Sequence, residues 1–127
     1  MRSSLVLSIV LLMLTIAAGC WTGSIADGLS DRYGSAAEEL RILTGAADWA
    51  RAAEVAAAYT TDWHRTVPWL QILINHEDID DVTLSLTRLE SAIAQQDAAE
   101  CAYACAELKE NAGHIYHRDA FTLGNVL

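Results

Sequence analysis

The chain has 127 residues, 53% of them hydrophobic, with 17 acidic residues against eight basic ones. All the acids and seven of the bases follow Arg2, so the remainder carries a net charge of −10, which disfavours nucleic acid and anionic headgroups as partners. A single proline and abundant alanine and leucine favour helices throughout, and we expect an all-α fold without a nucleic-acid partner.

Residues 5–18 form an uncharged apolar run in which Ser8 and Thr15 can bond back to helix carbonyls. Counted to Trp21, the run has 17 residues, the lower limit for crossing a bilayer. Arg2 and the amino terminus precede it, so the positive-inside rule places that end in the cytoplasm. We expect residues 1–26 to be a single-pass signal-anchor in the cell membrane and residues 27–127 to form one extracytoplasmic domain.

Two other fates of this segment remain open at the level of sequence. A short charged start followed by an apolar stretch also describes a cleavable secretion signal. Residues 17–20 resemble a lipoprotein lipobox in which Cys20 would be lipidated, although Ala17 stands where a large aliphatic residue is usual. Both alternatives still place the domain outside the cytoplasm.

Beyond the anchor, apolar residues recur at intervals of three and four, which predicts four helices in two antiparallel hairpins. Such hairpins would pack as a four-helix bundle or in a tetratricopeptide-like manner. The first helix should stop at Gly45, and Asp48 and Asp97 should cap the second and fourth. Pro68 should kink the second helix or restart it with Thr66 as a new cap. The expected inward positions are Ile25, Leu29, Tyr33, Ala36, Leu40, Leu43, Trp49, Ala52, Ala53, Ala56, Thr60, Trp63, Trp69, Leu70, Leu73, Ile74, Ile79, Val82, Leu86, Leu89, Ile93, Cys101, Cys105, Leu108, Ala112 and Ile115.

The two halves of this region resemble each other. A shift of 49 residues places Asp48 on Asp97 and Leu40 on Leu89, with Ala52 falling on Cys101. The identity is weak, but the pattern is typical of duplicated helical hairpins.

The densest group of ionisable side chains is residues 76–81, in which four acids follow a histidine. His76, Glu77 and Asp80 are the candidate metal ligands, because carboxylates and an imidazole at four-residue spacing can share one helical face. The competing interpretation is that the acids favour the positive end of the helix that starts here. We expect this second role and no resident cofactor.

Other reactive side chains give no linear signature of an enzyme. Cys101 and Cys105 lie one turn apart on an apolar seam, which favours buried free thiols over a metal site, a redox site or an intermolecular disulfide. His114 and His117 suit the negative end of the last helix as well as metal ligation, and His64 has no identifiable acidic partner. No nucleophile–base pair, phosphate loop or zinc motif is present in the sequence, and we expect no catalytic site.

The tryptophans offer the candidate interaction surface. Trp63 and Trp69 flank Pro68, where an interrupted helix would expose a groove for a peptide or a muropeptide-like ligand. Burial in the core is the competing interpretation, because large apolar groups are mostly inside. The tail over residues 116–127 carries enough apolar side chains to dock on the bundle.

Short segments spread over nearly the whole chain form a recognisable set together with the amino-terminal anchor: Asp48-Trp49, Ala52, Trp63, Trp69-Leu70, residues 75–80 (Asn-His-Glu-Asp-Ile-Asp), residues 85–89 (Ser-Leu-Thr-Arg-Leu), Glu107-Leu108-Lys109, His114-Ile115 and the ending Leu-Gly-Asn-Val-Leu. In these segments the chain resembles the bacterial domain of unknown function 4363 family, whose members look like short single-pass proteins with a small helical outer domain. The chain departs from the family by its alanine content and by Pro68. The resemblance implies the architecture and lends no activity, cofactor or catalytic residue.

The sequence therefore predicts a non-enzymatic, membrane-tethered helical domain that binds another envelope protein or its own copy. The alternative is an extracytoplasmic sensor of a ligand or divalent ion, centred on residues 76–81.

Overall fold

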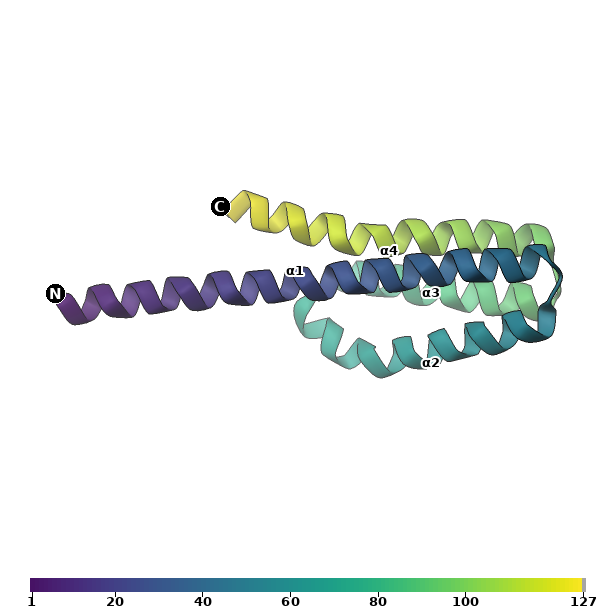
Figure 1. Ribbon diagram of the computed structural model, residues 1–127, viewed down its shortest axis with the longest axis horizontal. Helices are drawn as coiled ribbons and strands as arrows, with labels where there is room; N and C mark the ends of the chain where they lie inside the picture. Colours follow the sequence, from purple (N-terminus) through teal and green to yellow (C-terminus); the bar gives the residue numbers. More distant parts are fainter. Residues whose placement is uncertain (127) are drawn as a thin grey trace.

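A computed structural model describes the backbone of residues 1–126 and the side chains of residues 1–115. Over these residues the chain forms four helices and no strand: α1 (Arg2–Gly45), α2 (Trp49–Leu73), α3 (His76–Ala94) and α4 (Ala98–Val126). Short loops make successive helices antiparallel, and the α1–α2 and α3–α4 loops lie together at one end of the bundle (Figure 1). The predicted all-α fold of two hairpins is confirmed.

The helices close into a ring, which distinguishes a four-helix bundle from stacked tetratricopeptide hairpins. Each helix packs on the next, and α1, the first, packs most extensively on α4, the last. Buried small side chains accompany this close approach, among them Ala36 on α1 and Ala104 on α4. Between α1 and α2 the buried side chains are larger, among them Tyr33 on α1 and Trp63 on α2. The chain is thus an up-down-up-down bundle.

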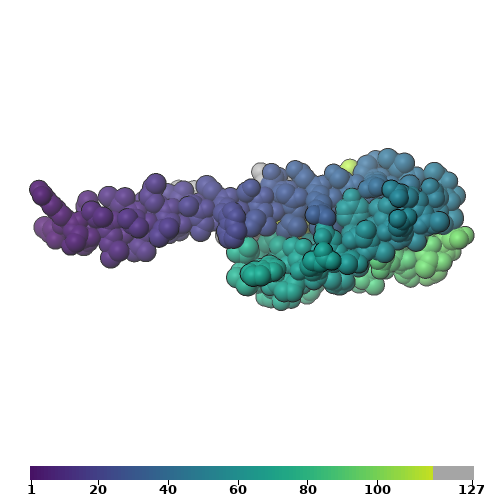
Figure 2. All heavy atoms as spheres, turned by 60° about the horizontal axis from the view of Figure 1, so that its bottom comes forward, coloured from purple at the N-terminus to yellow at the C-terminus, as the bar shows by residue number. Residues whose placement is uncertain are grey.

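The first half of α1 projects from this bundle as a separate rod (Figure 2). Its most apolar stretch of 18 residues has a mean hydropathy of 2.3, and none of it is buried within the structure. The hydroxyl of Ser8 donates to the carbonyl of Ser4 at 2.9 Å, and that of Thr15 donates to the carbonyl of Leu11 at 2.8 Å. This half is long and apolar enough to cross a membrane, and its polar side chains bond to their own helix.

The second half of α1 belongs to the bundle, and no break separates the halves. Ala26, Tyr33 and Leu40 are buried in the core, and the expected boundary at residues 26–27 falls inside the continuous helix. With a rise of about 1.5 Å per residue, the helix is roughly 66 Å long. The apolar run and the first helix of the bundle are therefore one continuous helix.

The core follows the predicted seams almost everywhere. Ala53 is an exception because it is exposed, and Thr60 is only partly buried. Predicted residues that are buried are Tyr33, Ala36, Leu40, Ala52, Ala56, Trp63, Leu70, Ile74, Ile79, Val82, Leu86, Leu89, Ile93, Cys101, Cys105, Leu108, Ala112 and Ile115. The helical period therefore identified the inner faces of all four helices.

The α1–α2 and α3–α4 loops have the same hydrogen-bonding pattern, displaced by 49 residues. The amide of Asp48 donates to the carbonyl of Leu43 at 3.0 Å, and the amide of Asp97 donates to that of Ala92 at 3.1 Å. Each aspartate then caps the next helix by accepting from the amide three residues on. Both predicted caps are confirmed, and the loop geometry agrees with the duplication seen in the sequence.

In both loops a residue with a left-handed backbone conformation follows the end of the helix, and in neither loop is it a glycine. Ala47 has a φ of 56° and Gln96 a φ of 54°, and each fills the position that glycine usually takes in this type of helix ending. The prediction that α1 stops at Gly45 is confirmed, and the left-handed residue follows two positions later, at Ala47.

Glycine at either left-handed position should therefore stabilise the bundle. Ala47→Gly and Gln96→Gly should each raise the free energy of unfolding by about 1 kcal/mol, because a left-handed conformation costs other residues roughly that amount. Denaturant unfolding of the full chain in detergent micelles measures the change. Ala46→Gly is the matched control: Ala46 has a φ of −85°, so this glycine should only destabilise. Equal effects of A46G and A47G would contradict the assignment.

Of the two effects predicted for Pro68, a kink or a restart of α2, the restart is wrong. The helix is continuous from Trp49 to Leu73, and the hydroxyl of Thr66 donates back to the carbonyl of Asp62 at 2.8 Å instead of capping a new helix. Proline leaves the carbonyl four residues earlier without its amide partner, and here both Pro68 and His64 are exposed, so water can serve that carbonyl. Figure 1 shows α2 bowed, with its carboxyl-terminal end curving toward α3.

Candidate functional site

An aromatic cluster joins α1 to α2. The ring of Tyr33 meets Trp63 edge to face with centroids 5.0 Å apart, and it meets Tyr59 on its other side at 6.1 Å. The indole of Trp63 donates to Oγ1 of Thr83 on α3 at 2.8 Å, and the side chain is fully buried. Trp63 was an interaction-surface candidate, and that prediction is wrong because three helices enclose the indole and satisfy its N–H.

Charged side chains surround the cluster at the α1–α2 surface. Arg32 forms an ion pair with Asp62, and the hydroxyl of Tyr59 donates to Oε2 of Glu39 at 3.1 Å. A shallow hollow of about 410 Å³ lies between these groups. The contacts fix the antiparallel register of the two helices, pairing position 32 with 62, 33 with 63 and 39 with 59.

Burial governs the acid–base behaviour of this cluster. Loss of water around Tyr33 is the main cause that raises its pKa to about 12, and the nearby Asp62 carboxylate adds to the effect. The pKa of Tyr59 is also raised, first by burial and then by its hydrogen bond to Glu39. Both phenols therefore stay protonated at neutral pH, and their role here is packing.

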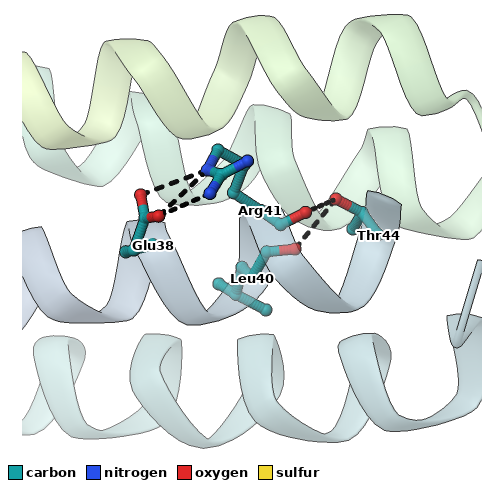
Figure 3. Close-up of polar contacts among 4 residues, drawn as sticks. All are labelled: Glu38, Leu40, Arg41 and Thr44. Atoms are coloured by element: carbon teal, nitrogen blue, oxygen red, sulfur yellow. Dashed lines mark hydrogen bonds and ion pairs between the residues drawn. The ribbon is translucent and has the colours of Figure 1, made fainter. Parts of the chain in front are cut away.

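Polar contacts within α1 gather near the end of the helix (Figure 3). The Arg41 guanidinium donates to both carboxylate oxygens of Glu38, and this hydrogen bond is the main reason that the pKa of Glu38 lies below its usual range. The buried hydroxyl of Thr44 donates to the carbonyl of Leu40 at 2.8 Å. These interactions stay within one helix and shape no binding site.

The acidic group at residues 76–81 lies at the start of α3. The side chain of Asn75 caps the helix by accepting from the amide of Glu77 at 3.0 Å, and Glu77 and Asp78 occupy the first turn. His76, Glu77 and Asp80 are exposed, whereas Asp78 is buried. Within residues 1–115 no three His, Cys, Asp or Glu side chains converge as a metal site would require. The cap is thus an amide side chain, with the acids placed at the positive end of the helix.

The thiols of Cys101 and Cys105 lie inside the bundle and are free, as is the exposed Cys20. Burial is the main cause that raises the pKa of Cys105 to about 11, and it raises that of Cys101 as well. The reactive form of cysteine is the thiolate, which is therefore disfavoured at both positions. The prediction that both thiols are buried is confirmed.

The histidines are dispersed. His114 on α4 is partly exposed, with Nε2 3.9 Å from Oε1 of Glu110 on the preceding turn. His64 is exposed on the outer face of α2. The side chain of His117 and the predicted docking of the tail side chains over residues 116–127 lie outside the described residues.

Two large apolar side chains of α2 point away from the core. Trp69 is 73% exposed and Ile72 is 77% exposed, although Leu70 and Ile74 beside them are buried. The sequence interpretation placed Trp69 on the inner face, which is wrong, whereas its candidacy as a surface residue agrees with its exposure. Ile72 was missed. The available signal was its position three residues after Trp69, since this spacing puts the two side chains on one helical face.

The model of the family described as domain of unknown function 4363 matches residues 22–126 of this chain. The match takes in the bundle and starts directly after the exposed apolar part of α1. No curated protein and no solved structure matches the chain.

Proposed function

We propose that this chain, which belongs to the domain of unknown function 4363 family, is a membrane-tethered helical domain that binds another envelope protein or its own copy without catalysing a reaction. The observation that carries the proposal is the continuity of α1. One half of the helix is apolar and exposed, and the other half packs on α4 and α2 as part of the bundle. A domain held this way cannot swing freely relative to its anchor.

The exposed apolar helix and the charge before it support a chain that crosses the membrane once, with its amino terminus in the cytoplasm. An apolar helix that no protein surface covers is stable in lipid, because its backbone groups bond within the helix and its side chains are as apolar as the hydrocarbon around them. Arg2 precedes the span and places the amino terminus in the cytoplasm by the positive-inside rule. The bundle is then extracytoplasmic, at the cell envelope, with its excess of acidic side chains facing outward.

The surface of the bundle supports binding of a macromolecule over chemistry on a small substrate. The hollow at Arg32 and Asp62 is shallow and open, and its polar groups are already paired with one another. The buried thiols are held in their unreactive form. Exposed apolar side chains outside the span include Ile42 on α1 and Tyr103 on α4, which offer contact area to a partner protein.

Site-specific photo-crosslinking in intact cells tests this proposal. A photoreactive residue replacing Ile42 or Tyr103 in the full chain should give one discrete adduct on irradiation. Twice the mass of the chain would identify self-association, and any other single mass would identify an envelope partner. The adduct should persist when expression is lowered tenfold, because a specific complex does not depend on random collision. Only monomer at both positions, and at Leu84 on α3, would contradict the proposal.

A further inference from the structure

The exposed pair Trp69 and Ile72 forms an apolar face at the end of α2 that the side chains of residues 1–115 leave uncovered. Both side chains are about three-quarters exposed, and the adjacent Leu70 and Ile74 are buried among the other helices. Figure 1 shows this end of α2 at the end of the bundle from which the apolar half of α1 emerges. The pair is therefore directed outward at the end nearest the proposed membrane.

The register of α1 against α2 places the pair more closely along the bundle axis. The contact of Glu39 with Tyr59, taken with those of Tyr33 with Trp63 and Arg32 with Asp62, shows that positions further down α1 pair with positions further up α2. Continued at the same rise, this register puts Trp69 level with about residue 27 and Ile72 level with about residue 24. Measured along the bundle axis, the level of Ile72 thus lies within about one helical turn of the level of Trp21, the last residue of the apolar run.

The length of the apolar run fixes where the membrane boundary must lie. Residues 5–21 only just reach the lower limit for crossing a bilayer, so the outer boundary cannot lie much before Trp21. Trp21 is 63% exposed, and an indole is most stable in the headgroup layer, where one part of the ring is in apolar surroundings and its N–H is hydrated. The same layer then extends sideways to the end of α2.

We propose that Trp69 and Ile72 insert into the outer headgroup layer and give the bundle a second contact with the lipid surface, beside α1. The inference rests on the proposed function, in which α1 spans the membrane. Two attachment points hold the bundle at one tilt and one rotation against the membrane, whereas a single helix would fix neither. The face of the bundle that meets a protein partner is then set by the membrane itself.

The charges near this corner select the kind of lipid. Asp80 is exposed at the start of α3, next to the end of α2, and it repels an anionic surface. Arg65, one turn before Trp69 and also exposed, is the nearby cation on α2. We therefore expect the contact to form with zwitterionic phosphatidylcholine and to weaken when phosphatidylglycerol is added.

Quenching of tryptophan fluorescence by brominated lipid tests the contact with the full chain in phosphatidylcholine vesicles. The chain has four tryptophans, and the quenched part of the emission should come from Trp21 and Trp69. Lipid brominated at the start of the acyl chain should quench them more than lipid brominated near its end. Trp69→Phe and Trp21→Phe should each remove about half of the quenched emission, because two indoles lie in the interface. Trp49→Phe, at the far end of α2, is the matched control and should leave it unchanged.

The outcomes separate this inference from the proposal on which it rests. Loss of quenching in W21F but not in W69F would overturn the second contact and leave the anchor intact. No quenching in the wild-type chain would overturn both. Ile72→Asp gives an independent readout, since a carboxylate in the interface should withdraw the corner and lower the quenching of Trp69. Unchanged quenching in I72D would also contradict the inference.

Discussion

Replacing Trp63 with alanine should lower the free energy of unfolding by about 3–5 kcal/mol, the range for removing a fully buried tryptophan. The indole is enclosed by α1, α2 and α3, stacks edge to face with Tyr33 and donates a hydrogen bond to Thr83. Alanine would leave a cavity between α1 and α2, the pair of helices that large side chains hold apart. Denaturant unfolding of the full chain in detergent micelles measures the loss.

Two further variants give this experiment its specificity. Tyr103→Ala removes an exposed aromatic side chain of α4 and should change the stability by less than about 0.5 kcal/mol. Trp63→Phe keeps most of the volume and loses the indole N–H, so it should cost an intermediate amount, roughly 1–2 kcal/mol. Equal effects of W63A and Y103A would show that Trp63 is not the packing centre described here.

Raising the pH from 10 to 12 should destabilise the bundle, with Tyr33 as the largest single contributor. In the folded chain its pKa is about 12, whereas a free tyrosine titrates near 10. Between these values the unfolded chain releases a proton that the folded chain retains, so stability falls as the pH rises. Two pKa units correspond to at most about 2–3 kcal/mol. Below pH 9 this contribution is constant.

The substitution Tyr33→Phe should remove the share of this alkaline loss that Tyr33 contributes while keeping the aromatic contacts. The comparison is the free energy of unfolding at pH 10 and at pH 12 for both chains. A clear loss should remain in Y33F, because burial also raises the pKa of Cys105, to about 11, and this thiol titrates in the same direction. A pH dependence in Y33F as steep as in the wild type would contradict the assignment.

The helical seams could be predicted from sequence because burial in a bundle imposes one period on every helix. Tyr33, Leu40, Leu89 and Leu108 lie where that period puts them, and the caps at Asp48 and Asp97 follow from local chemistry. Rules that use only neighbouring residues do not predict which face of a helix the rest of the fold leaves exposed. Pro68 fails to end α2 because its own face of the helix is exposed, which no local pattern states.

The candidate site residues likewise divide into those that the sequence could place and those that depend on the rest of the fold. Trp63 and Trp69 are both near a proline, but six residues place them on different helical faces, so one is buried and the other exposed. Trp63 and Leu70, seven apart, share the inner face, and this spacing was a usable signal. For residues 76–81, the local interpretation as a helix start agrees with the structure, while the cap itself comes from Asn75.

The central claim is that one helix both anchors the chain and supports the bundle. It is tested most directly by expressing the full chain in a bacterial host, extracting the membranes with alkaline carbonate and measuring the intact mass of the protein that remains. The account predicts that the chain stays in the membrane fraction at its full mass of 13.8 kDa and that protease added outside spheroplasts digests the bundle. A shortened soluble chain, a lipidated chain beginning at Cys20, or a bundle protected from external protease would contradict it.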